Sequence, residues 1–296
     1  MSEQITTGFI KSWADAVRLA LQERGSKFRS TVSEATYVGE GAQVVEQIGQ
    51  TEARRVTSKN VPMAPANATH KIPWVYPGDW EWMDFVNSFD KLRRATDPTS
   101  TYARNAALAM GRAMDDELIA AFFGDMKHGK DGSSSETFDT AKYRIPVNEG
   151  GANSNLTVEK LRATREAMRG AKVELEFENL WVAIGESQER SLLSQSEYIN
   201  LDFDVRPVLK DGHLKSFLGF NFIVSTRLSK DASNYRRVPV WAESGMHLGV
   251  WMDLNPNIHQ RLDLTGRPFQ IDLMGTFGAT RVEQGKVVEI LCDETA

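Results

Sequence analysis

The segment from Asp97 to Gly124 carries the strongest helix signal in this sequence. Asp97 is a favourable N-cap, Pro98 fits the first helical position, and Gly124 supplies a left-handed stop. The pattern predicts one helix about 39 Å long at 1.5 Å per residue, with Arg112 and Asp116 on its wetter face. Its buried stripe is mostly alanine and methionine, spaced three or four residues apart, at Ala103, Ala107, Met110, Met114, Leu118 and Ala121.

The composition is that of an ordinary folded protein, with 296 residues of which 41% are hydrophobic and 25% charged. This length allows two modest cores. No stretch approaches the roughly 20 apolar residues of a membrane span, and the N-terminus lacks the pattern of a signal peptide. The single cysteine, Cys292, excludes an intramolecular disulfide and suits folding in a reducing cytosol. We expect it to be a small hydrophobe in a C-terminal strand.

The sequence offers no recognisable chemistry. The net charge of -5 argues against a protein that neutralises many nucleic-acid phosphates. Gly124 to Lys130 has the spacing of a phosphate-binding loop, but a helix precedes it and polar loop follows, so its context is wrong. The five histidines are too scattered to share a metal. We therefore predict no catalytic residue, no cofactor, no metal site and no enzyme.

Two segments before the long helix look like arms instead of core. Gly8 to Arg24 predicts an amphipathic helix whose polar face mixes charges, which favours docking on protein over a membrane surface. Val38 to Phe89 is poor in core residues and holds short strand-like runs at Gln43–Ile48, Ala53–Thr57, Lys71–Tyr76 and Trp80–Val86. A ribbon of this kind is marginal alone, so it must lie on something else.

The aromatic and proline residues of that ribbon allow two interpretations. Its prolines, Pro62, Pro65, Pro73 and Pro77, are typical of edge strands. Its aromatic residues serve either as anchors of a contact surface or as a minor core. They are Trp74, Tyr76, Trp80, Trp82 and Phe85.

The rest of the chain predicts a compact mixture of helices and strands. The expected helices are Thr157–Arg169, stopped at Gly170, and Ser187–Ser194. The order of elements indicates an α+β fold instead of alternating βαβ units. The expected strands are Tyr143–Val147, Leu180–Ile184, Phe217–Ser225, Pro239–Ala242 and Met246–Trp251, followed by two tail strands joined by a turn at Glu283–Gly285.

Taken in order, these segments resemble the major capsid proteins of tailed double-stranded DNA bacteriophages, which have the Hong Kong 97-like fold. The motifs DPTSTYARNAALAMGRAMDDELIAAFFG, NLTVEKLRATREAM, LWVAIGESQERSLL, KSFLGFNFIVSTRL and GTFGATRVEQGKVVEIL carry the resemblance. It implies an N-terminal arm (1–37), an extended β-hairpin loop (38–90) across a neighbouring subunit, and a peripheral domain with a long spine helix (91–150). An axial domain (151–245) and C-terminal strands of the peripheral domain (246–296) complete the implied division.

The resemblance also implies a function. Such a chain self-assembles as hexamers and pentamers into the icosahedral head of a virion, in the host bacterial cytoplasm, and encloses DNA without sequence-specific binding. The short stretch before the first helix favours a separate scaffolding protein. A portal protein is a further implied partner, and a decoration protein is left open. No residue matches a known crosslinking position, so we predict no covalent crosslink. An encapsulin-like nanocompartment shell is the alternative, and an enzyme of unknown class is a more distant one.

The candidate residues for contacts between subunits lie on the ribbon and on the long helix. Asp115 and Asp116 point about 100° apart on a helix, which suits solvent exposure or an intersubunit salt bridge better than acid–base catalysis. A solvated face is an equally good interpretation of the charged candidates, since exposed ion pairs contribute about 0 to 1 kcal/mol. The set is Arg54, Arg55, Lys59, Trp74, Trp80, Arg104, Asp115 and Asp116.

Overall fold

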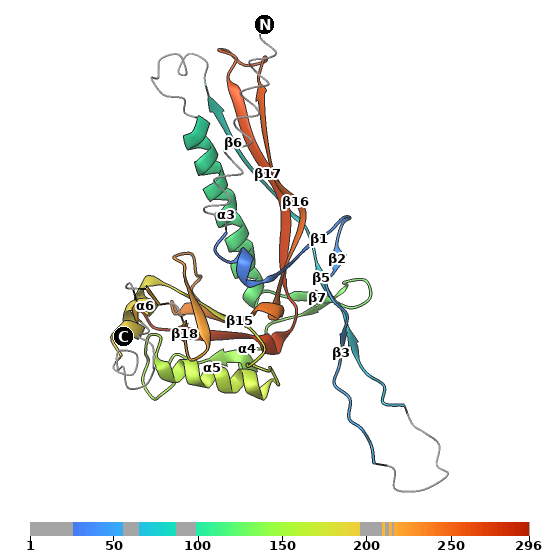
Figure 1. The fold of residues 1–296 in the computed structure, drawn as a ribbon, viewed down its shortest axis with the longest axis vertical. Helices are drawn as coiled ribbons and strands as arrows, with labels where there is room; N and C mark the ends of the chain where they lie inside the picture. Colours follow the sequence, from blue (N-terminus) through green and yellow to red (C-terminus); the bar gives the residue numbers. More distant parts are fainter. Residues whose placement is uncertain are drawn as a thin grey trace.

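The computed structural model describes residues 26–55, 65–86, 99–195, 209–210, 213–214 and 216–295. A long helix runs beside an elongated sheet, a second sheet packs near the end of that helix, and a narrow ribbon projects away from both (Figure 1). The predicted helix at Gly8 to Arg24 and the caps Asp97 and Pro98 lie outside the described residues, and they stay predictions. Among the helices described, none is long and apolar enough to cross a membrane.

The long helix, α3 (Thr99–Phe123), confirms the strongest prediction. Ala107, Met110, Met114 and Leu118 of the predicted stripe are buried, while Arg112 is exposed. The stop at Gly124 is wrong in its geometry, because this glycine does not adopt a positive φ. Its amide instead continues the helical pattern with a 3.0 Å hydrogen bond to the Ala120 carbonyl.

The elongated sheet contains four strands in the order β1-β16-β17-β6. Parallel pairing joins β1 to β16, and the other neighbours are antiparallel. The helix α3 lies against the face that contains Gly275, where an added Cβ would approach the Met110 Cε to 3.4 Å. The bounds are β1 (Ser33–Thr36), β6 (Gly78–Val86), β16 (Met246–Gln260) and β17 (Phe269–Arg281).

The second sheet contains six strands in the order β13-β14-β10-β15-β18-β9. The helix α5 (Val158–Gly170) packs on it and starts at Thr157, whose hydroxyl accepts from the Lys160 amide. Both α5 and α6 (Glu186–Leu193) confirm predicted helices. The predicted stop at Gly170 is wrong, because α5 includes Gly170 and the residue with a left-handed backbone after the helix is Lys172, at φ 66°. The strands are β9 (Arg144–Ile145), β10 (Leu180–Ile184), β13 (Ser216–Phe217), β14 (Phe220–Val224), β15 (Arg236–Ala242) and β18 (Val287–Cys292).

Smaller elements complete the described fold. Strands β2-β5-β7-β8 form one small sheet, and β3 with β4 and β11 with β12 form two-stranded pairs. Their bounds are β2 (Ala42–Gln43), β3 (Gln47–Ile48), β4 (His70–Lys71), β5 (Pro73–Val75), β7 (Met126–His128), β8 (Ser134–Glu136), β11 (Leu209–Lys210) and β12 (His213–Leu214). The short helices are η1 (Arg29–Thr31), α4 (Thr140–Tyr143), η2 (Glu243–Gly245) and η3 (Gln284–Lys286).

Several predictions about strands need correction. The strand from Met246 extends to Gln260, because two register shifts let β16 continue past Trp251. Residues 53–55 form no strand, and Pro73 opens β5, which lies between β2 and β7 and not at an edge. Gly124–Lys130 is not a phosphate-binding loop, in agreement with the sequence analysis, but the polar loop expected after the long helix contains the strand β7, which pairs with β8.

The sheets also cross the predicted division of the chain. Strand β6, predicted as part of the extended loop, pairs along its length with β17. The predicted turn after Glu283 is present as η3, but the two tail strands separate there: β17 stays in the four-stranded sheet and β18 enters the six-stranded one. Cys292 is fully buried in β18, as expected, and burial raises its pKa to about 12.

A buried carboxylate holds two strands of the six-stranded sheet. Glu289 of β18 is fully buried and accepts hydrogen bonds from Arg144, at 2.5 Å, and from Arg237. We expect Arg237→Leu to lower the free energy of unfolding by about 3 kcal/mol, because it leaves a buried charge with one partner fewer. Urea denaturation of the unassembled subunit measures this. Arg169→Leu, which removes only an exposed pair, is the control and should change it by less than about 1 kcal/mol.

His247 of β16 provides a pH-dependent contribution to stability. Its ring lies 2.9 Å from the Ser33 hydroxyl and 3.0 Å from that of Tyr37. Burial lowers the pKa of His247 from 6.5 to about 4. Between these two pH values the imidazole is protonated in the unfolded chain and neutral in the folded chain. We expect this residue to reduce the free energy of unfolding by about 2 kcal/mol between pH 7.5 and 5. Urea titrations of wild type and His247→Gln should differ by that amount; equal pH dependence would contradict the assignment.

Candidate assembly surfaces

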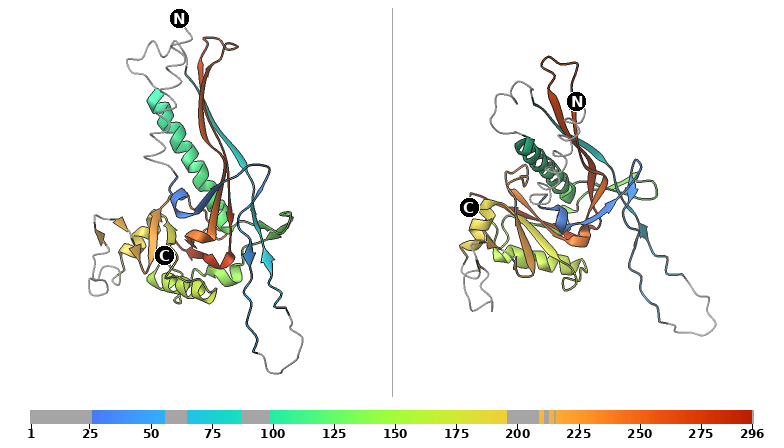
Figure 2. Two further views of the ribbon diagram at one scale, coloured as in Figure 1. Left: turned by 45° about the vertical axis from the view of Figure 1, so that its right-hand side comes forward. Right: turned by 45° about the horizontal axis from the view of Figure 1, so that its top comes forward.

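The projecting ribbon, which we define as residues 47–55 and 65–71, is attached to the body only at its root. The side-chain amide of Gln47 donates to the Val282 carbonyl at 3.3 Å, and Lys172 Nζ lies 2.5 Å from Gln50 Oε1. Beyond that point residues 51–55 are all exposed. The ribbon points away from the far end of the elongated sheet in every view (Figure 2). It therefore buries little surface within its own chain.

Three of the candidate contact residues lie on the ribbon or in the segment that joins its two described parts. Arg54 and Arg55 are exposed, and neither makes an ion pair with any residue that the structure describes. Lys59 lies outside the described residues. At the ribbon root, Val45 and Ile48 add exposed apolar area, with exposed fractions of 59% and 67%. The ribbon thus combines cationic and apolar side chains.

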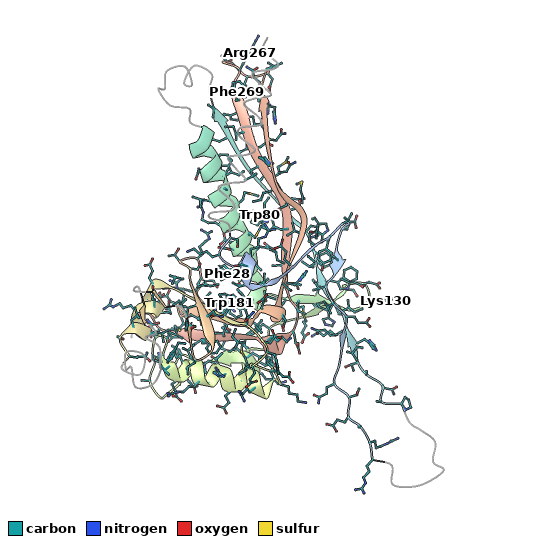
Figure 3. All side chains as sticks on the ribbon, in the orientation of Figure 1. Phe28, Trp80, Lys130, Trp181, Arg267 and Phe269 are labelled. Atoms are coloured by element: carbon teal, nitrogen blue, oxygen red, sulfur yellow. The ribbon has the colours of Figure 1, made fainter. Side chains whose placement is uncertain are left out.

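The two candidate tryptophans have different roles. Trp74 is half-buried, donates its indole N–H to the Gly129 carbonyl at 2.6 Å and stacks on Tyr76. It anchors the base of the ribbon to the β7–β8 hairpin, whose tip carries Lys130 (Figure 3). Trp80 of β6 stacks on Phe277 at 5.9 Å between ring centroids and remains 36% exposed. Only Trp80 keeps a substantial free face.

Asp115 and Asp116 on α3 are used inside the chain. The solvent exposure expected for Asp115 is wrong, because it is only 6% exposed and accepts from the Ser26 hydroxyl and from the Lys27 and Phe28 amides. Burial raises the pKa of Asp115 while these hydrogen bonds oppose the shift.

Asp116 binds an arginine of the same subunit. Arg227 Nε donates to Asp116 Oδ1 at 2.5 Å, and Arg227 Nη2 donates to Asp116 Oδ2. The two adjacent carboxylates therefore tie α3 to the N-terminal segment and to the loop after β14. For Arg104, the last candidate on this helix, the structure describes the backbone alone.

A further surface lies on the side of the elongated sheet opposite α3. We call it the outer face and define it by Asp79, Glu81, Met83 and Phe85 of β6 with their neighbours on β17. Met83 and Phe85 are 46% and 39% exposed, and Asp79 accepts from the Thr276 hydroxyl at 2.7 Å. Of this acidic and apolar set only Phe85 was named from the sequence, among the aromatic residues of the ribbon, although the alternation of β6 with period two contains the signal for the whole set.

The centre of the outer face holds another carboxylate. Asp272, opposite Met83 in the β6–β17 register, is 6% exposed. Burial raises its pKa, while His259, whose Nδ1 lies 3.6 Å away, lowers it. The face is therefore acidic overall and has hydrophobic side chains beside its charges.

The described part of the chain offers little support for a metal site or a ligand-binding pocket. It contains no group of three His, Cys, Asp or Glu side chains placed to hold a metal ion. An open hollow beside α4 is lined by residues 136–143 and Gln284, but the side-chain amide of Gln284 is already used, since it accepts from the Asp139 amide and donates to the Thr137 carbonyl. The notable surfaces are the ribbon and the outer face.

Comparisons with known proteins address the fold and the family. The structure is similar to capsid proteins of Cyanophage Pam1 (11% identity, 92% of this chain and 93% of that one, TM-score 0.70) and Cyanophage P-SCSP1u (14%, 89% and 86%, 0.68). It is also similar to a structure from Mycobacterium phage Bobi (16%, 91% and 91%, 0.62). The mixed α+β architecture is thus the Hong Kong 97-like capsid fold.

Sequence comparison identifies the family. A search of curated proteins finds no match. The family model described as phage capsid protein, however, matches residues 5–294, which is nearly the whole chain. The chain therefore belongs to the phage capsid protein family, a family of virion structural proteins.

Proposed function

We propose that this capsid protein assembles as hexamers and pentamers into the icosahedral head that encloses the double-stranded DNA of a tailed phage. The projecting ribbon carries the proposal, because a two-stranded element with so little internal burial gains stability only on another surface. A neighbouring subunit supplies that surface. Each contact is modest, but closed symmetry repeats it many times, so weak pairing that can correct errors still gives a durable shell.

The wider setting follows from the same proposal. A net charge of -5 suits a wall that encloses DNA without holding it tightly. We expect a separate scaffolding protein and a portal protein as partners, with a decoration protein as an option that the chain does not decide. Assembly would occur in the host cytoplasm, and the role would be structural and not enzymatic. Arg54, Arg55, Lys59, Trp80 and Arg104 remain the proposed contact residues.

The direct test is to express the chain alone and with its scaffolding protein, and to examine the products by light scattering and negative-stain electron microscopy. We expect closed shells, or free hexamers and pentamers, and angular heads that depend on the scaffold. Regular shells that form without scaffold and contain a co-purified enzyme would favour the encapsulin-like alternative. A stable monomer or dimer under both conditions would refute a shell role.

The ribbon itself can be tested by replacing residues 50–68 with a short Gly-Ser linker. Since the ribbon contributes little to the subunit core, we expect the midpoint of thermal unfolding of the subunit to change by no more than about 2 °C, which corresponds to roughly 1 kcal/mol. Shell formation should be lost. The control replaces the exposed turn at residues 149–152 in the same way and should leave assembly intact. Normal shells from the shortened ribbon would contradict the proposal.

A further inference from the structure

Arg281 of β17 is a buried cation whose hydrogen-bonding capacity is only partly used. It is 1% exposed, and its Nη1 atom donates to the carbonyls of Phe122 and Gly124 at 2.8 and 3.0 Å. Its Nε and Nη2 atoms are buried and have no hydrogen-bond partner among the described residues. A buried donor without an acceptor costs free energy and is uncommon in folded proteins, so this free edge of the guanidinium calls for an explanation.

The free edge of Arg281, formed by Nε and Nη2, has the geometry that binds a carboxylate through two parallel hydrogen bonds. Three other arginines of this chain use the same two atoms in that way. The pairs are Arg29 with Glu34, Arg227 with Asp116, and Arg236 with Glu294. The free edge of Arg281 is therefore suited to a carboxylate.

Glu136 of β8 lies on the face of the small sheet that meets Arg281. It pairs directly with Met126 of β7, and directly paired side chains lie on the same face of a sheet. Met126 is 1% exposed, so this face is the buried one. Val75 of β5 is buried on the same face, and an added Cβ at Gly278 of β17 would lie 3.5 Å from its Cγ2. The buried face therefore lies against the strand that contains Arg281.

Two further observations favour Glu136 as the carboxylate for this edge. The Arg281 Cζ atom lies 5.1 Å from the ring centroid of Phe138, which comes two residues after Glu136. Burial lowers the pKa of Arg281, and the charge of Glu136 opposes that shift more than the charge of Asp125 does. Asp125 is exposed, whereas Glu136 is partly buried. The position of Glu136 thus suits the buried edge better than that of Asp125.

In the structure Glu136 binds a different cation, Lys71 of the ribbon. Lys71 pairs with Gln47 in the β3–β4 ladder, so this ion pair is one of the contacts that attach the ribbon at its root. The two side chains are 33% and 34% exposed. Ion pairs that are open to solvent in this way are weak, so Glu136 can leave Lys71 at little cost.

We infer that Glu136 is a switch with two positions, and that it binds either Lys71 at the ribbon root or the free edge of Arg281. In the first position it holds the ribbon on the small sheet. In the second it releases Lys71 and completes the hydrogen bonds of a cation that already binds the carbonyls at the end of α3. The attachment of the ribbon and the full hydrogen bonding of Arg281 therefore compete for one carboxylate. The switch acts within a single subunit and goes beyond the proposed shell role.

Removing Lys71 tests the switch in the unassembled, full-length subunit. In the Lys71→Met variant Glu136 moves to Arg281, so adding Glu136→Gln should lower the folding equilibrium constant at least about tenfold, because two charge-assisted hydrogen bonds are lost. Urea denaturation measures this constant. Asp125→Asn in the same background is the matched control and should change it by less than about twofold, since Asp125 is exposed. A neutral Glu136→Gln, or a large effect of Asp125→Asn, would show that the switch is wrong.

The second position of Glu136 can also be observed directly. A crystal structure of the Lys71→Met subunit should show the Glu136 carboxylate about 2.8 Å from Nε and Nη2 of Arg281. Water or a buffer anion on that edge, with Glu136 in solvent, would overturn the inference. Both measurements use the subunit before assembly. Their failure therefore leaves the proposed shell role standing, and an absence of shells leaves the switch standing.

Discussion

The arrangement of the described body depends on one aromatic junction. Trp241 of β15, Phe122 in the last turn of α3 and Phe28 before η1 are fully buried against one another, with 4.6 Å between the centroids of Trp241 and Phe122. The Trp241 indole donates to the Thr31 carbonyl at 2.9 Å. Three segments that are distant in sequence therefore meet at one place. Because packed aromatic side chains are costly to separate, this junction fixes the last turn of α3 against the six-stranded sheet.

Two charged side chains add hydrogen bonds on either side of that junction. Arg281 at the end of β17 donates to the carbonyls of Phe122 and Gly124, at 2.8 and 3.0 Å, where the negative end of the α3 dipole lies. Asp115 accepts from Ser26 and the amides of Lys27 and Phe28 on the other side of the junction. These hydrogen bonds join the described body into one connected unit, although the Nε and Nη2 atoms of Arg281 are buried without a hydrogen-bond partner among the described residues. The projecting ribbon shares none of these contacts, so the packing at this junction does not depend on it.

Local signals predicted the helices well and the strand partners poorly. The stripe of α3 and the Thr157 cap of α5 are encoded within one or two turns, so the sequence alone reveals them. The pairing of β6 with β17 joins residues nearly 200 positions apart, and no local pattern encodes it. Asp115 illustrates the same limit for the candidate contacts, because its partners lie 87 to 89 residues earlier in the chain. The outer face was not identified as a surface, although its residues on β6 alternate along one strand, because the sequence does not show which side of that strand the helix α3 covers.

The position of the ribbon also bears on symmetry. A ribbon that lies on a different surface of the next copy forms a head-to-tail contact, which repeats from copy to copy instead of closing in a pair. Such a contact ends in a ring only when the rotation between neighbours divides a full turn. The shell proposed above contains rings of five and of six copies, so the rotation between neighbours has to take two values there, and the contact between copies has to tolerate that difference.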